Sequence, residues 1–219
     1  MKVLNVLITC MAIFFGGCAT KLTGSVSTEI DPDYPIDKSM VVVVKAAEHL
    51  GANTMTTKFY LDRIASALRS IGFKNAYTQK SLPAGAPPVD QYVSVNIESK
   101  TSSYQYTGAD YGTVDAGRSK TSCIGTGLYV NCTTSSDKTF GVTGYSQKTG
   151  YIRGNYLAMS WFDVKSKKLS MFTFASSSNQ QCSEEVNFHF LIDEGTKALS
   201  LDRPSKNNFS AEVPREICK

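Results

Sequence analysis

The sequence predicts an α+β fold, a two-layer arrangement in which a mixed sheet of about five strands carries two helices on one face. Three observations support this class. Short β-branched or alternating apolar runs recur along the chain, two segments repeat apolar residues at helical spacing, and a stretch rich in glycine and tyrosine interrupts them. With 219 residues, 42% of them apolar and 19% charged, the chain can bury one core. We therefore expect a single domain with appendages.

The first residues have the pattern of a secretory signal. Lys2 precedes an apolar run from Val3 to Phe15, and small residues follow the run. The run is too short to span a membrane. A buried strand or helix is the alternative interpretation, but an uncharged run at the extreme terminus favours a signal peptide of residues 1–17 that is removed after export.

Residues 18–39 are predicted to be a flexible tether. From Ala19 to Ser39 the chain is polar, contains Thr, Ser, Gly, Asp and Pro, and shows no apolar period. Such a coil would span on the order of 25 Å. The folded domain is then expected over residues 40–219.

This domain is expected to open with a strand, a helix and a second strand. Residues 40–44 are a continuous apolar run, mostly valine, typical of a strand that is buried on both faces or central in a sheet. The helix that follows has Thr56 or Thr57 as its N-cap and Gly72 as its C-terminal stop. A proline-rich loop at residues 81–88 then leads to the second strand. The apolar positions are Tyr60, Leu61, Ile64, Leu68 and Ile71 in the helix, and Val93, Val95 and Ile97 in the strand.

Residues 100–155 are predicted to be an insertion. Nine of the sixteen glycines lie between Lys100 and Gly154, together with most of the tyrosines. Tyrosine and threonine favour pleated surfaces and glycine marks turns, so we expect a β-hairpin or a long loop. Its tyrosines are a candidate interaction surface, because tyrosine offers contact area with a polar tip. Simple strand formation is the competing interpretation. The candidate interaction residues are Tyr104, Tyr106 and Tyr111.

A hairpin, a helix and a short strand complete the expected domain. The hairpin turns at residues 165–168, and the second helix has Ser183 as its N-cap and ends before Pro204. Residues 209–213 are the last strand. The apolar positions are Leu157, Met159 and Trp161 in the first hairpin strand, Leu169, Met171, Phe172 and Phe174 in the second, and Phe188, Leu191, Ile192, Gly195 and Leu199 on the helix.

Four cysteines are expected to form two disulfides in the exported domain. Cys10 is removed with the signal, and an even number of cysteines remains in the folded part. Four cysteines allow three pairings, of which proximity in the sequence favours Cys123 with Cys132 and Cys182 with Cys218. A zinc site of four thiolates is the alternative, but the close Cys-x-x-Cys pairs that it requires are absent.

The sequence contains no recognisable catalytic, cofactor or metal site. The two histidines, His49 and His189, lie in no ligand or nucleophile pattern. Gly125 and Gly127 lack the third glycine of a dinucleotide loop. A net charge of +4 without a run of basic residues argues against nucleic-acid binding. We therefore expect a protein that is not an enzyme, uses no cofactor and binds no nucleic acid.

The segment Phe15-Gly16-Gly17-Cys18 resembles the lipobox of bacterial lipoproteins, in which two small residues precede a cysteine that is acylated. The resemblance implies cleavage before Cys18 and attachment of acyl chains, such as palmitate, that bind the protein to a membrane. Phe15 stands where leucine is usual, and Gly17-Cys18-Ala19 is a competing site for ordinary signal peptidase. Ala19 is not the aspartate that retains related lipoproteins at the inner membrane. The implied location is therefore the periplasmic face of the outer membrane.

The order of elements over residues 40–214, with a Gly72-Phe73 helix exit, resembles bacterial lipoproteins classed as domains of unknown function. It is also similar to the periplasmic domains of curli-secretion lipoproteins and of outer-membrane activators of peptidoglycan synthases. Such a resemblance implies a fold more than a function. We expect a non-enzymatic protein of envelope assembly or maintenance whose partner is another envelope protein or peptidoglycan. The alternatives are an envelope hydrolase or hydrolase inhibitor near peptidoglycan, and display on the outer surface of the cell.

Overall fold

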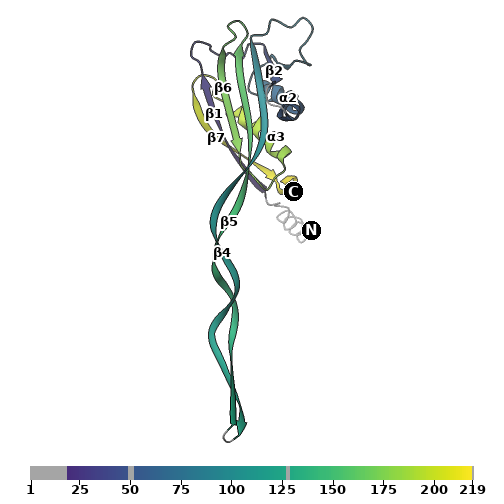
Figure 1. Cartoon of the computed structure of the whole chain (residues 1–219). Helices are drawn as coiled ribbons and strands as arrows, with labels where there is room; N and C mark the ends of the chain where they lie inside the picture. Colours follow the sequence, from purple (N-terminus) through teal and green to yellow (C-terminus); the bar gives the residue numbers. More distant parts are fainter. Residues whose placement is uncertain (1–18, 49–51, 127–128, 219) are drawn as a thin grey trace, which may run out of the picture. The chain divides into compact units, whose positions relative to one another are not determined.

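The computed structural model describes residues 19–48, 52–126 and 129–218. Its strands form one seven-stranded mixed sheet in the order β3-β2-β4-β5-β6-β1-β7 (Figure 1). The prediction of about five strands is therefore wrong, although the coarser α+β class agrees with a described structure of strands and two α-helices. The chain divides into two units. We call Ser102–Ile152 the ribbon, and the described residues up to Thr101 and from Arg153 onward the body.

Two of the strands, β4 and β5, belong to both units, because each runs from the body into the ribbon. The bounds are β1 Ala19–Ile30, β2 Val42–Ala46, α2 Ala52–Ser70, β3 Ala76–Thr78, β4 Gln91–Thr126, β5 Tyr129–Asp163, β6 Leu169–Ser177, α3 Glu184–Lys197, β7 Ser205–Pro214 and a final 3-10 helix Arg215–Cys218.

Strand β1 occupies much of the segment that the sequence predicted as a tether. It pairs antiparallel with β6 on one side and with β7 on the other. Leu22 and Val26 are buried on its inner face, but so are Thr20 and Thr28. Because two of these four inward side chains are polar, the segment lacks the apolar alternation by which a strand is recognised. The tether prediction for residues 18–39 is wrong over the length of β1.

Strand β2 is an interior strand of the sheet and is buried on both faces, one of the two possibilities that its valines predicted. It lies between β3 and β4 and runs parallel to both. Val42, Val43 and Val44 are all buried, as is Val41 just before the strand. Strand β3 was not predicted, because its three residues are too few to show a period of two. Together β1 and β3 account for the rise from five strands to seven.

Helix α2 begins earlier than the sequence indicated. It starts at Ala52, so the N-cap prediction at Thr56 or Thr57 is wrong. Thr57 lies inside the helix, where its hydroxyl accepts a hydrogen bond of 3.0 Å from the backbone N–H of Ile97. The predicted end is confirmed, since Gly72 has a φ of 112°, a conformation that glycine adopts without steric cost.

Helix α3 begins as predicted. The Ser183 hydroxyl accepts a hydrogen bond of 3.3 Å from the backbone N–H of Val186. Glu184 and Glu185 lie in the first turn, where carboxylates are favoured by the positive end of the helix dipole. The predicted inward residues Phe188, Leu191, Ile192 and Gly195 are buried, and Leu199, which follows the helix, packs against the same core.

Both helices cover the same face of the sheet in the body (Figure 1). Trp161 is fully buried on β5, and its ring centroid lies 5.3 Å from that of Phe73. On the outer side of the layer, the guanidinium of Arg63 on α2 donates two hydrogen bonds to the carboxylate of Asp193 on α3. The core joins Ile64 and Leu68 of α2, Phe188, Leu191 and Ile192 of α3, and Val42, Val44, Val93, Val95, Ile97, Leu157, Met159 and Met171 of the sheet.

Candidate interaction site

The ribbon is a β-hairpin, one of the two forms expected for the insertion. It consists of the parts of β4 and β5 that lie outside the body, and Figure 1 shows these two strands winding around each other. Cross-strand contacts pair Gly112 with Thr143, and Thr121 with Thr134, so the strands are antiparallel. Most described side chains of the ribbon are exposed to solvent.

Glycines in the ribbon make room for a larger side chain on the opposite strand. A Cβ atom on Gly150 would lie 2.5 Å from the Tyr104 ring, and one on Gly141 would lie 2.8 Å from a methyl group of Val114. Both distances are shorter than a carbon contact allows, so the larger side chain lies over backbone that glycine leaves uncovered. This cross-strand pairing accounts for Gly141 and Gly150, whereas a Cβ atom on Gly117 or Gly144 would meet open space.

The three predicted interaction residues are exposed and fall into two clusters. Tyr104 and Tyr106 are neighbours on β4, with ring centroids 5.8 Å apart. Tyr111 stacks across the strands on Phe140, with centroids 6.0 Å apart and 9° between the ring planes. The exposed fractions of Tyr104, Tyr106 and Tyr111 are 48%, 45% and 65%. The ribbon therefore presents aromatic side chains to solvent at two places along its length.

Other apolar residues extend this surface, and the sequence did not single all of them out. Phe140 is 76% exposed, and Val142, Tyr145 and Tyr151 are exposed as well. Phe140 and Val142 are two positions apart, so they project from the same face of the strand. The spacing of two could have indicated an apolar strand face in the sequence, but most neighbouring residues are polar, so no longer alternating pattern is visible.

Polar contacts join the two strands between the aromatic clusters. The Asp110 carboxylate accepts a hydrogen bond of 2.9 Å from the Ser146 hydroxyl, and lies 3.3 Å from the Lys148 ammonium. Farther along, the Ser136 hydroxyl donates a hydrogen bond of 2.8 Å to Asp115. These groups are largely in contact with water, so they set the alignment of the strands more than they stabilise them.

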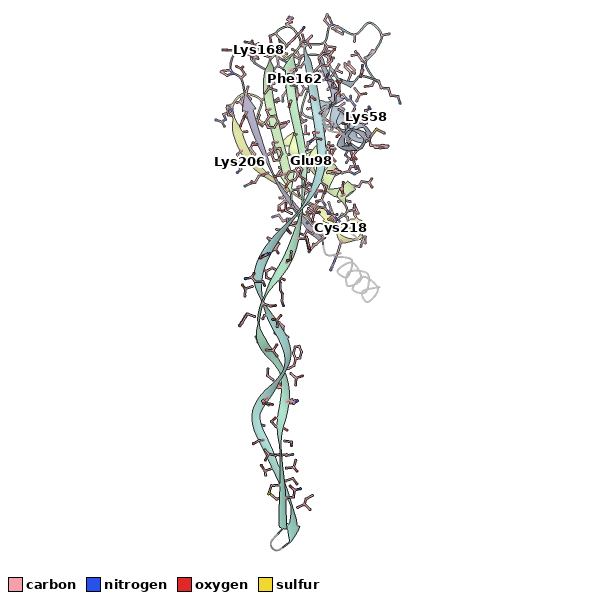
Figure 2. The ribbon with its side chains drawn as sticks, in the orientation of Figure 1. Lys58, Glu98, Phe162, Lys168, Lys206 and Cys218 are labelled. Atoms are coloured by element: carbon pink, nitrogen blue, oxygen red, sulfur yellow. A yellow bond between two sulfur atoms is a disulfide. The ribbon has the colours of Figure 1, made fainter. Side chains whose placement is uncertain are left out.

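Both favoured cysteine pairings are confirmed. Cys123 and Cys132 form a disulfide in the ribbon, and Cys182 and Cys218 form one in the body (Figure 2). The second disulfide lies in a small buried cluster with Leu22 of β1. All four thiols are used in these bonds, which excludes the four-thiolate zinc site. Elsewhere in the described part of the chain, no group of His, Cys, Asp and Glu side chains is arranged to hold a metal ion.

The predicted signal peptide 1–17, the lipidation candidate Cys18, His49 and Gly127 lie outside the described residues. Strand β1 nevertheless begins at Ala19, so the described structure already includes the residue that follows the expected acylation position. Ala19 pairs with Pro214 of β7, close to the disulfide of Cys218. Among the helices that the structure describes, none is both long and apolar enough to cross a membrane.

The other place where titratable groups gather is the outer side of α2 and α3. The Tyr60 ring lies edge-on to the ring of His189, with centroids 5.8 Å apart. Burial raises the pKa of Tyr60, and the negative charges of Glu185 and Glu184 raise this pKa further, whereas Arg63 lowers it.

His189 also lines a cavity of about 280 Å³ beside this pair of rings. The lining residues are Arg63, Val186, His189, Phe190, Asp193, Glu194, Ala211, Val213 and Ile217. This set holds no serine, cysteine or lysine, so the described lining offers His189 no such nucleophile to activate. The ribbon is therefore the better candidate for a functional site.

Comparisons with known proteins identify no family for this chain. No family model matches the sequence, and no curated protein matches it. Among solved structures, a dodecamer of a PelC variant from Paraburkholderia phytofirmans is similar at 12% identity over 78% of this chain and 92% of that one, with a TM-score of 0.42. A PDZ domain protein from Parabacteroides distasonis is similar at 7% identity over 94% of this chain and 42% of that one, with a TM-score of 0.37. At these scores neither likeness bears on what this chain does.

Proposed function

We propose that this chain is a lipoprotein held on the periplasmic face of the outer membrane by acyl chains on Cys18. It acts without catalysis in envelope assembly or maintenance, by binding another envelope protein through the ribbon. The observation that carries the binding role is the exposed aromatic surface around Tyr104, Tyr106 and Tyr111. Protein interfaces are enriched in aromatic residues, and tyrosine in particular combines contact area with hydrogen bonding.

The disulfides support export. Bonds such as Cys123–Cys132 and Cys182–Cys218 persist in oxidising compartments, which include the periplasm. The lipid anchor is supported by the sequence alone, through the small residues that precede Cys18 at the end of an apolar run. More than one acyl chain is needed for stable attachment, and a mature lipoprotein carries that many.

Photocrosslinking in living cells tests the binding role. A photoreactive phenylalanine analogue is placed at Tyr104 or at Tyr111, and in a control at Lys74, an exposed residue of the body. We expect the same envelope proteins to be linked from both ribbon positions and not from Lys74. Identical products from all three positions, or cross-links to no other protein, would contradict binding through the ribbon.

Membrane fractionation tests the anchor separately. We expect Cys18→Ser to move the protein from the outer-membrane fraction to the soluble periplasmic fraction, or to leave it as an unprocessed precursor, because the acyl chains have no attachment point. Cys10→Ser is the matched control, since it changes a cysteine of the signal segment that carries no lipid. A Cys18→Ser protein that stays with the outer membrane after a carbonate wash would refute the anchor.

A further inference from the structure

The two outer edges of the ribbon have no neighbouring strand among the described residues. In the body, β2 pairs with β4 only as far as Val95, and β6 pairs with β5 only from Asn155 onward. Beyond these positions β4 and β5 have only each other. Each outer edge therefore presents a row of backbone N–H and C=O groups, which is a template for another strand.

The edges of the body differ from the edges of the ribbon. At one side of the body sheet β3 has only three residues. At the other side β7 carries Lys206 (Figure 2) and Glu212 and ends at Pro214. Short edge strands, charges and proline are the usual protections against pairing between chains. Between Ser102 and Ile152 there is no proline and there are only seven charged residues. The same chain therefore protects the edges of its body and leaves those of its ribbon open.

The arrangement of charges along the ribbon fits a neighbour of the same sequence. The cross-strand contacts of the ribbon keep a single antiparallel register, in which each step forward on β4 is matched by one step back on β5. The contacts are Gly112 with Thr143, Val114 with Gly141, Thr121 with Thr134, and Cys123 with Cys132. The same register sets Arg118 directly opposite Asp137. Both side chains are exposed, and neither forms an ion pair within the described part of the chain.

If β4 of one copy pairs with β5 of the next copy in this register, Arg118 again faces an Asp137. The other charged residues of the ribbon then face uncharged residues. Asp115 faces Phe140, Lys120 faces Ser135, and Lys138 faces Gly117. No two like charges stand opposite each other, and like charges directly opposite are what would destabilise such a pairing.

The area available matches that of a stable interface. About 24 residues on each strand, at roughly 3.3 Å per residue, make an edge about 80 Å long. With a sheet thickness of about 10 Å, such an edge offers roughly 800 Å². A standard interface takes about 800 Å² from each partner. One ribbon edge is therefore large enough to hold a second copy.

From these observations we infer that this protein associates with further copies of itself, through antiparallel pairing of β4 in one ribbon with β5 in the next. The contact is heterologous, so each copy uses two different edges, and the assembly is a ring if the rotation between copies closes and an open filament if it does not. The inference rests on the proposed function only in using the ribbon as the binding element. The backbone edges of the ribbon bind other copies of this chain, whereas its aromatic side chains bind the other envelope protein.

Cross-linking between two tagged forms of the full chain tests this arrangement. Both forms carry Cys18→Ser, so that no lipid contributes to association. One form also carries Arg118→Cys and the other Asp137→Cys, and the two are mixed under mild oxidation. We expect a disulfide that joins a copy with one tag to a copy with the other. The control is a mixture of Arg118→Cys with Lys148→Cys, whose positions lie far apart in the proposed register. Its yield of cross-linked product should be at least about tenfold lower than that of the Arg118→Cys and Asp137→Cys mixture.

Charge reversal provides a second measurement on the same contact, by sedimentation of the Cys18→Ser chain. Arg118→Asp alone and Asp137→Arg alone each set like charges opposite across every contact, and we expect association weakened about threefold. Mixed in equal amounts, the two variants restore opposite charges between copies and should associate as the parent does. Mixing changes nothing within a chain, so recovery reports on contacts between chains alone.

Three results would overturn the inference. The chain could sediment as a monomer at every concentration, Arg118→Cys copies could link mainly to one another, which would indicate a β4-to-β4 contact, or the mixture of charge variants could fail to recover. Photocrosslinks from Tyr104 and Tyr111 to another protein would persist in each of these cases. Failure of self-association is thus distinguishable from failure of the proposed function.

Discussion

Tyr60 is a partly buried side chain of the body whose pKa is changed by the groups around it. Its ring lies between α2 and α3, edge-on to Phe188 with centroids 5.6 Å apart and to His189 with centroids 5.8 Å apart. Burial is the main reason that its pKa is raised above the ordinary value of 10.0. The folded state therefore favours the neutral phenol more than the unfolded chain does.

This shift predicts a loss of stability at alkaline pH that Tyr60→Phe removes. The contribution of the neutral Tyr60 phenol to the free energy of unfolding is fully present below a pH of about 10, the pKa of an unfolded tyrosine. It is lost as the pH rises through the higher pKa of the folded state. We expect the difference in unfolding free energy between wild type and Tyr60→Phe to be constant from pH 7 to 9. Above pH 10 wild type should lose unfolding free energy that Tyr60→Phe keeps, so the difference should change in the direction that makes the variant relatively more stable. Urea unfolding followed by the fluorescence of Trp161, the single tryptophan, measures it.

Tyr111→Phe is the control for this measurement, because Tyr111 is exposed on the ribbon and outside the body that Trp161 reports on. Its unfolding free energy should follow wild type at every pH. A Tyr60→Phe variant that loses stability in parallel with wild type above pH 10 would show that this hydroxyl is not the group responsible.

At the scale of elements, the sequence predicted those whose buried positions are apolar. Val93, Val95 and Ile97 alternate with polar residues and are all buried, so the body part of β4 could be recognised from its own residues. Strand β1 could not, because its burial of Thr20 and Thr28 depends on β6 and β7, which are remote in sequence. Propensity within a segment does not report such long-range pairing.

The same limit applies to the candidate site. The tyrosines of the ribbon were recognisable from composition, as was the tendency of that segment to form strands. The stacking of Tyr111 on Phe140 and the cover of Gly150 by Tyr104 follow from the cross-strand register. Register is set by turn geometry and by partner strands, and a single segment does not encode it.

The two disulfides are predicted to stabilise different elements. Loop closure gives about 3.8 kcal/mol for Cys182–Cys218 and about 2.7 kcal/mol for Cys123–Cys132. Replacing Cys182 and Cys218 with alanine should therefore lower the urea midpoint of the Trp161 transition, because both sulfurs are buried in the body. Replacing Cys123 and Cys132 should leave that midpoint unchanged, since this bond lies in the ribbon.

Protease sensitivity provides the converse readout for these two double variants. Loss of Cys123–Cys132 should speed tryptic cleavage at Arg118 and Lys120, because an isolated two-stranded hairpin is only marginally stable. Loss of Cys182–Cys218 should leave the early cleavage at those sites unchanged. Equal effects of the two variants on Trp161 would argue against the division of the chain into two units.

On the scale of the whole molecule, the position of β1 links the fold to the expected anchor. Strand β1 pairs on both sides in the body sheet, and its first residue, Ala19, follows Cys18 directly. In the sequence, only the bond between Cys18 and Ala19 separates the proposed acylation position from the first residue of β1, in place of the spacer first expected. Under the proposed anchor, acylation of Cys18 would hold the Ala19 end of the body sheet near the membrane surface rather than at the end of a flexible coil.

Two variants of the full chain distinguish this arrangement from a tether. Deletion of residues 19–30 would merely shorten a tether, but here it removes a strand and the buried side chains of Leu22 and Val26. Those two side chains alone contribute roughly 3–6 kcal/mol, against a total stability of about 5–15 kcal/mol for a typical domain. We expect the deleted chain to lose the cooperative Trp161 transition. Ten Gly and Ser residues inserted between Cys18 and Ala19 should leave both that transition and the fractionation unchanged, whereas a deletion variant that unfolds as wild type does would show that β1 is dispensable to the sheet.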